Sequence, residues 1–112
     1  MVSARIHVDE NGCIRFAEAE GHAGGALKGE NIPCAGITLL LRTAARLLEG
    51  EGGLHMEGSA PCRGNLSFRI ESYSVESMER IRGITDFLCL GLNDLARDFP
   101  KEIDIRIEMS KE

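Results

Sequence analysis

Aromatic side chains and positive charge are scarce in this chain. The sequence has no Trp, one Tyr and four Phe among 112 residues, and its formal net charge is −5. Proteins that bind single-stranded nucleic acid stack bases on aromatic side chains, and a negatively charged surface repels phosphate backbones. We therefore predict no direct binding of nucleic acid.

Cysteine pairs and long apolar runs are also missing. None of the four cysteines belongs to a Cys-x-x-Cys pair, which a structural zinc site usually contains, so we expect no metal site and no cofactor. No apolar run of a signal peptide opens the chain, and its longest apolar stretches are too short to span a bilayer. These absences predict a cytoplasmic protein with reduced thiols and no membrane association.

The apolar pattern predicts one domain, residues 1–112, in the order strand, strand, helix, strand, strand, helix, strand. Alternating apolar residues predict strands at about 4–9 and 13–20, around Leu54 and Met56, and at about 66–70 and 103–107. Ala60 to Gly64 is expected to turn the chain. Two amphipathic helices and five half-polar strands predict a two-layer α+β sandwich, with both helices on one face of a mixed or antiparallel sheet. The pattern leaves the strand order open.

Helical spacing of apolar residues places the first helix at about 32–49 and the second at about 75–97. Asn31 is the expected N-cap of the first helix, and Ser74 that of the second. The predicted buried stripes are Ile37, Leu40, Leu41, Ala44, Leu47 and Leu48 on the first helix, and Met78, Ile81, Thr85, Leu88, Leu92 and Leu95 on the second.

The first two strands are expected to form a hairpin. A three-residue loop of residues 10–12 pairs Val8 with Ile14 and Ile6 with Phe16, which keeps the apolar side chains on one face. Gly12 then takes the left-handed position of a bulge.

The segment Gly21 to Cys34, GHAGGALKGENIPC, has no periodic apolar pattern and contains four glycines, three of them Gly24, Gly25 and Gly29. Long glycine-rich loops in compact domains usually carry function or are disordered. Residues 23–30 are therefore predicted to form a lid that closes over a substrate.

The ends of this segment carry complementary chemistry. Cys34 falls in the first turn of the first helix, where unpaired N–H groups and the helix dipole stabilise an anion. His22 could activate the thiol and then protonate a leaving group, while the N–H groups hold an oxyanion. A single Cys or His is more often a structural residue, but the two together favour a small cysteine hydrolase with no metal.

Gly21-His22-Ala23 and the stretch from Gly29 to Ala35 resemble the signature of the ribosomal-processing cysteine protease family, formerly a domain of unknown function. The likeness covers the whole chain. The His and Cys of the family motif fall on His22 and Cys34, twelve positions apart.

This resemblance implies an activity and partners. Family members remove a short N-terminal extension from a large-subunit ribosomal protein, number twenty-seven, and cut after an aromatic residue. The expected partners are that ribosomal protein precursor, as a peptide substrate, and a second copy of the chain, since the family is generally dimeric. The new N-terminus is basic, which suits an acidic enzyme.

The sequence departs from the family pattern at four positions. The family usually has Asp at the place of Asn31, an aliphatic residue at Pro33, Ala at Gly36 and Ser at Thr38. Asn31 could orient the imidazole, although the N-cap is the preferred interpretation. Thr38 keeps a hydroxyl one turn after Cys34. Asn31, Thr38 and Ala35 are the expected supporting residues.

These departures keep two alternatives open: a non-catalytic, dimeric, ribosome-associated binding module, and a redox-sensing thiol at Cys34. The remaining cysteines are expected to be structural or incidental, Cys89 in the core, Cys62 in an exposed turn and Cys13 at a strand start. His7 and His55 are expected to face solvent or a dimer partner.

Overall fold

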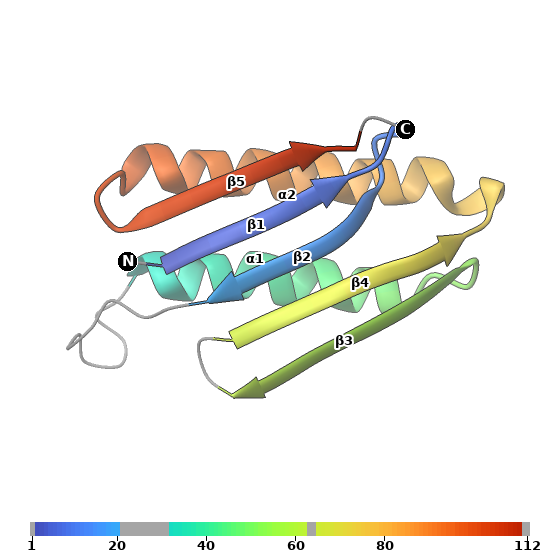
Figure 1. Cartoon of the computed structure of the whole chain (residues 1–112), viewed down its shortest axis with the longest axis horizontal. Helices are drawn as coiled ribbons and strands as arrows, with labels where there is room; N and C mark the ends of the chain where they lie inside the picture. Colours follow the sequence, from blue (N-terminus) through green and yellow to red (C-terminus); the bar gives the residue numbers. More distant parts are fainter. Residues whose placement is uncertain (1, 21–31, 63–64, 111–112) are drawn as a thin grey trace.

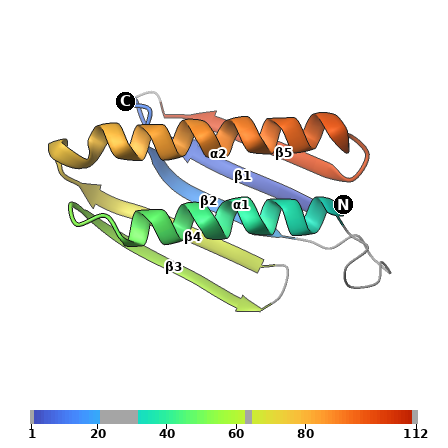
Figure 2. The same ribbon diagram turned by 180° about the vertical axis from the view of Figure 1, so that it is seen from behind.

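The computed structural model describes residues 2–20, 32–62 and 65–110. A five-stranded sheet forms one layer, and two long helices form the other, both on the same face of the sheet (Figures 1 and 2). The elements are β1 (Val2–Val8), β2 (Ile14–Glu20), α1 (Ile32–Glu49), β3 (Leu54–Cys62), β4 (Asn65–Tyr73), the 3₁₀ turn η1 (Val75–Ser77), α2 (Met78–Asp98) and β5 (Ile103–Met109). The predicted α+β sandwich and its element order are confirmed.

The sheet is mixed, and its strand order is β3-β4-β2-β1-β5. Neighbouring strands run antiparallel except for β1 and β5, which are parallel and pair from Val2 with Ile103 to Val8 with Met109. One end of the sheet therefore holds the beginnings of β1, β4 and β5 and the ends of β2 and β3, and α1 begins at this same end (Figure 1).

One of the two residue pairs predicted for the hairpin is confirmed, and the other is wrong. Val8 pairs with Ile14, and Gly12 has a positive φ of 80°, both as expected. The predicted pair of Ile6 with Phe16 is wrong, because an irregularity in the ladder at Val8 leaves Arg15 without a register partner. Ile6 pairs with Ala17 instead, and Phe16 pairs with His7. Since one extra residue reverses the facing of a strand, Phe16 lies on the sheet face opposite the helices.

The helices bury most of the predicted stripes. Helix α1 has the predicted bounds, and Ile37, Leu41, Ala44 and Leu48 are buried, but Leu47 is exposed, contrary to prediction. In α2 the buried residues are Ile81, Thr85, Leu88 and Leu92. This helix begins later than expected, because residues 75–77 form a 3₁₀ turn. Ser74 precedes that turn without a side-chain capping bond, and its hydroxyl lies 3.2 Å from that of Ser77.

Strand β3 is longer than predicted. We expected residues 60–64 to turn the chain, but β3 continues to Cys62. The turn was predicted from the stretch Pro61-Cys62-Arg63-Gly64. However, β3 is an edge strand, and Pro is tolerated at a sheet edge because its missing N–H need not bond to a neighbour.

A network around Asp9 closes the opposite end of the sheet. The Asp9 carboxylate accepts backbone N–H bonds from Asn11 at 2.9 Å and Cys13 at 3.0 Å. It also accepts a hydrogen bond from the hydroxyl of Tyr73, at the end of β4, and lies 3.5 Å from the Arg15 guanidinium. The β1–β2 turn is thereby tied to β4.

Candidate active site

Cys34 occupies the third position of α1, in its first turn. Its side chain is half-buried and packs against the hydrophobic core, while its neighbours Pro33 and Ile37 are buried and hold this turn on the sheet. Backbone N–H groups of a first helical turn have no partner within the helix, and the helix dipole is positive at this end. The local environment of Cys34 is thus suited to a developing negative charge.

The supporting residues on α1 lie where the helical spacing predicts. Ala35 is exposed beside Cys34, and Thr38 is half-buried one turn further along the helix. Ile32, immediately before Pro33, is 62% exposed. The side chains next to the thiol are therefore partly small and partly apolar. Such side chains suit contact with a peptide chain.

The other half of the predicted constellation lies outside the described residues. This applies to His22, to the expected N-cap Asn31 and to the glycines of the predicted lid, Gly24, Gly25 and Gly29. The structure does place the flanking elements: β2 ends at Glu20 and α1 begins at Ile32, both at the same end of the sheet (Figure 1). The pairing of His22 with Cys34 and the lid remain predictions.

Two other described cysteines have environments that oppose reactivity. Cys13 is fully buried, and burial raises the pKa of its thiol. Cys89 is half-buried on α2, where burial and then the nearby Asp86 carboxylate raise its pKa. Both are free thiols. A raised pKa lowers the fraction of nucleophilic thiolate at neutral pH, so neither is a candidate nucleophile.

A metal ion has no evident place in the described structure. No three His, Cys, Asp or Glu side chains among residues 2–20, 32–62 and 65–110 are grouped so that they could hold one. His7 and His55 are both exposed, as predicted, and each lies beside a carboxylate, His7 at 2.8 Å from Glu108 and His55 at 3.8 Å from Glu57.

Residues 1–104 match the family described as cysteine protease Prp. The chain belongs to this family. The match spans nearly all of the two-layer sandwich, from β1 to the start of β5.

Solved structures with the same fold support the Prp architecture. Prp from S. aureus with a covalently linked product peptide superposes with a TM-score of 0.78 at 17% identity, covering 96% of this chain and 100% of that one. The same enzyme with a substrate peptide gives 0.75 at 16% identity, with the same coverage. SMU.848 from Streptococcus mutans gives 0.76 at 21% identity, covering 98% and 96%. No match was found among curated proteins.

The sequence reasoning missed two features of this Prp chain. The predicted strand at about 4–9 gave Asp9 no role of its own, although an Asp two residues before Asn11-Gly12 is a known pattern for capping a turn. The outward position of Phe16 depends on the irregularity beside Arg15, for which the alternating pattern gave no signal.

Neither helix, within the described residues, is long and apolar enough to cross a membrane.

Proposed function

We propose that this Prp family member is a cysteine endopeptidase that removes the N-terminal extension of large-subunit ribosomal protein number twenty-seven in the cytoplasm. The observation that carries the proposal is the position of Cys34 in the first turn of α1, within a chain that matches the Prp family over residues 1–104. The S. aureus Prp structures with product and substrate peptides support a peptide as the substrate class.

The proposed mechanism uses Cys34 as nucleophile and His22 as general base. His22 accepts the thiol proton as Sγ attacks the carbonyl carbon of the scissile bond, and the backbone N–H groups of the first turn of α1 hold the oxyanion. Collapse of the tetrahedral intermediate breaks the C–N bond, and the leaving amine takes the proton from His22. Water then hydrolyses the thioester by the same proton relay, which releases the extension and restores the thiol.

In the proposal, three further residues and the glycine-rich segment support the arrangement of Cys34 and His22. Asn31 is proposed to set where α1 begins, with the N–H groups of the first turn left to the oxyanion. Thr38 supplies a hydroxyl one turn after Cys34, and Ala35 leaves room beside the thiol. The glycines of residues 23–30 allow this segment to order over the peptide and exclude water.

The negative charge of this chain favours binding of the basic N-terminus of the mature ribosomal protein. The formal net charge of the chain is −5. Glu20 ends β2, Asp98 ends α2 and Glu102 directly precedes β5, and all three are exposed, as are the nearby cations Arg97 and Lys101. Exposed carboxylates attract a basic peptide and raise its rate of association more than its affinity.

A homodimer is the second part of the proposal. Three large apolar side chains on the two helices are exposed to about the same extent: Leu39 at 65%, Phe87 at 67% and Leu90 at 65%. They lie on the helical layer, whose other side packs on the sheet (Figure 2). Apolar groups gathered on one surface of a soluble domain are typical of a protein interface, and a second copy related by twofold symmetry would cover them.

The test is cleavage of a peptide that carries the extension and the basic ribosomal N-terminus. We expect Cys34→Ala and His22→Ala each to lower turnover by roughly 10⁴-fold or more, because the two residues act as a unit. Neither change should alter thermal stability much, since Cys34 is only half-buried. Cys89→Ala, a matched change of a half-buried cysteine, should cut the peptide as wild type does.

Cys34→Ser makes a finer distinction, because it keeps the shape of the side chain but loses the easily formed anion. We expect it to bind the uncut peptide without turning it over. If wild-type protein binds the peptide as tightly as Cys34→Ala does but leaves it intact, the chain is a ribosome-associated binding module and the peptidase proposal fails.

A further inference from the structure

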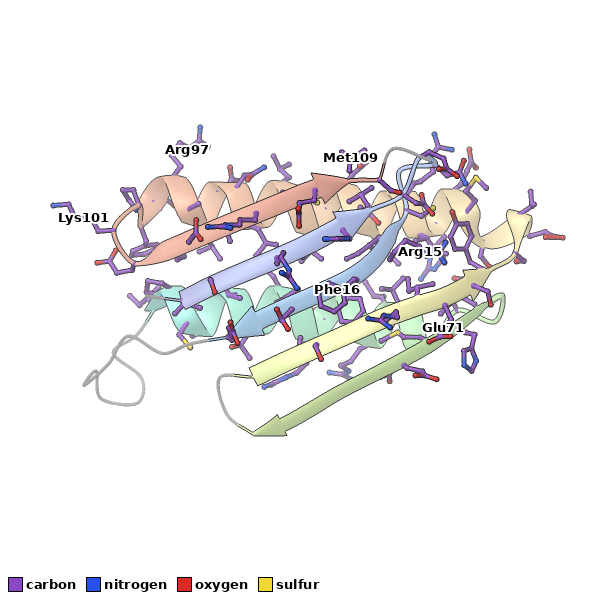
Figure 3. The ribbon with its side chains drawn as sticks, in the orientation of Figure 1. Arg15, Phe16, Glu71, Arg97, Lys101 and Met109 are labelled. Atoms are coloured by element: carbon purple, nitrogen blue, oxygen red, sulfur yellow. The ribbon has the colours of Figure 1, made fainter. Side chains whose placement is uncertain are left out.

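The sheet face opposite the helices carries an aromatic ring among cations. The ladder irregularity beside Arg15 turns Phe16 onto this face, between β2 and β4 (Figure 3). The guanidinium carbon of Arg5 lies 5.5 Å from the centre of the Phe16 ring, and that of Arg69 lies 5.8 Å from it. The His7 ring meets it edge-on at 6.0 Å. Two strands, β1 and β4, therefore place cationic or ionisable groups around a ring carried by β2.

This arrangement lines an open hollow of about 480 Å³. The lining residues are Arg5, His7, Arg15, Phe16, Arg69, Ile70 and Glu71. The lining contains three guanidinium groups and one carboxylate, but Arg5 also lies beside Glu18 and Arg15 beside Asp9, so among the described residues Arg69 is the lining arginine that has no ion pair.

The three arginines differ in how far they are already engaged. Arg15 donates hydrogen bonds to the carbonyl oxygens of Ile70 at 3.0 Å and Glu71 at 2.8 Å, so its guanidinium mainly ties β2 to β4. Arg5 lies 3.6 Å from Glu18, and both side chains are partly exposed. An exposed ion pair of this kind contributes little to the free energy of folding. Arg5 can therefore exchange the Glu18 carboxylate for another anion.

Arg69 is the arginine best placed to take an incoming anion. Its register partner on β3 is Glu57, but that carboxylate lies 3.8 Å from His55. Among the described residues, the Arg69 guanidinium contacts the Phe16 ring. A contact with an aromatic ring takes up no hydrogen bond of the guanidinium, so its N–H donors remain able to bond to an anion.

We propose that this hollow binds a small molecule that has both an oxyanion and a flat ring. The oxyanion, a phosphate or a carboxylate, would lie between Arg69 and Arg5 and form charge-assisted hydrogen bonds, while the ring packs against Phe16. Nucleotides and aromatic carboxylates both have this chemistry. The site is separate from the proposed peptidase site, since Cys34 lies on α1 on the other side of the sheet. It does not depend on the proposed cleavage.

Binding is tested with four small probes followed by NMR shifts of the backbone amides of Phe16 and Arg69. Adenosine monophosphate is compared with ribose 5-phosphate, and benzoate with acetate, so that each pair differs in the ring. We expect at least one ring-bearing probe to bind with a dissociation constant of about 1 mM or tighter, and its ringless counterpart to bind more weakly. The adenosine and benzoate arms tell a phosphate source from a carboxylate source.

Variants separate the site from general charge attraction. Arg69→Gln should weaken binding about tenfold, as expected for the loss of one charged hydrogen bond. Phe16→Leu should remove the difference between ring-bearing and ringless probes. Arg97→Gln is the matched control, because Arg97 lies on α2 beside Asp94, on the other side of the sheet from the hollow, and it should bind as wild type does. No binding of any probe at 10 mM, or equal weakening by Arg69→Gln and Arg97→Gln, overturns the proposal.

Discussion

Gly36 of α1 lies directly against Leu95 of α2. A Cβ atom built at position 36 would come within 3.0 Å of both δ-carbons of Leu95, which is closer than ordinary van der Waals contact. The same arrangement recurs one turn along with the roles exchanged, because a Cβ at Gly91 would lie 3.1 Å from the δ-carbons of Leu40. The two helices therefore pack closely by setting a leucine of one helix against a glycine of the other. The packing against Leu95 therefore gives Gly36 a structural role in this chain.

A double-mutant cycle measures the contact between Gly36 and Leu95. In wild-type protein, Gly36→Ala gains about 1 kcal/mol of helix propensity, but the added methyl group presses on Leu95, and overpacking typically costs about 1–3 kcal/mol. In the Leu95→Ala background only the gain remains. We expect Gly36→Ala to be more favourable there by about 1 kcal/mol or more in urea unfolding. Equal effects in both backgrounds would show that the methyl group meets no resistance.

Cysteine labelling tests the environment of Cys34. Cys13 is fully buried and Cys89 half-buried, and burial raises the pKa of both thiols. Cys34 lies in the first turn of α1, where an anion is favoured. With iodoacetamide near neutral pH, followed residue by residue in the native protein, we expect Cys34 to react first and Cys13 last. Similar rates for Cys34 and Cys89 would contradict a special role for the helix start.

Acid should weaken the fold through Asp9. Burial alone would raise the pKa of Asp9, but hydrogen bonds from Tyr73, the N–H groups of Cys13 and Asn11, and Arg15 outweigh it and lower the pKa below 3.8. A lowered pKa contributes stability that is present above the unfolded value and is lost as the pH falls through the folded value. The difference in free energy of unfolding between wild type and Asp9→Asn should therefore shrink between about pH 5 and pH 2. A constant difference would exclude this contribution.

Alkali should weaken the fold through Tyr73. Burial, and then the hydrogen bond to Asp9, raises the pKa of Tyr73 from 10.0 to about 12. A raised pKa contributes stability that is fully present below the unfolded value and is lost as the pH rises through the folded value. Wild type should therefore lose stability relative to Tyr73→Phe between pH 10 and pH 12. Absorbance of tyrosinate, the only one that this chain can form, gives the folded pKa directly.

The proposed dimer is tested at Phe87. Phe87→Glu places a carboxylate in the interface twice, once from each copy, so we expect the dissociation constant of the dimer to rise about 100-fold or more. Sedimentation over a range of protein concentrations measures it. Met109→Glu, a matched change of a residue 60% exposed on β5, should leave the dimer intact. Wild type that remains monomeric at high concentration would remove this part of the proposed function.

Helical periodicity was the most informative part of the sequence. The bounds of α1 follow from a repeating apolar stripe between Pro33 and Gly50, because a long stripe averages over single exceptions such as Leu47. The two-layer fold follows from the same patterns, since amphipathic helices must cover an apolar sheet face. Cys34 lies in the first turn of α1, as the position of Pro33 indicated, while its catalytic role and its pairing with His22 stay predictions.

The strand register and the strand lengths were harder to predict from the sequence, because single residues decide them. One residue without a partner, Arg15, reversed the facing of Phe16, and the sequence alternates in the same way with or without it. Pro61 was interpreted as a turn signal, but the edge position of β3, which only tertiary structure sets, makes Pro acceptable there.

The parallel pairing of β1 with β5 has a consequence for how the chain reaches this fold. Val2 pairs with Ile103, so the outer neighbour of β1 leaves the ribosome after both helices and the other four strands. Until then the nascent chain can form the β1–β2 and β3–β4 hairpins, but the outer edge of β1 stays open and the part of the core under β5 is uncovered. Closing so long a loop is entropically costly and slows folding. This chain therefore completes its sheet only after both helices and the other four strands have been made.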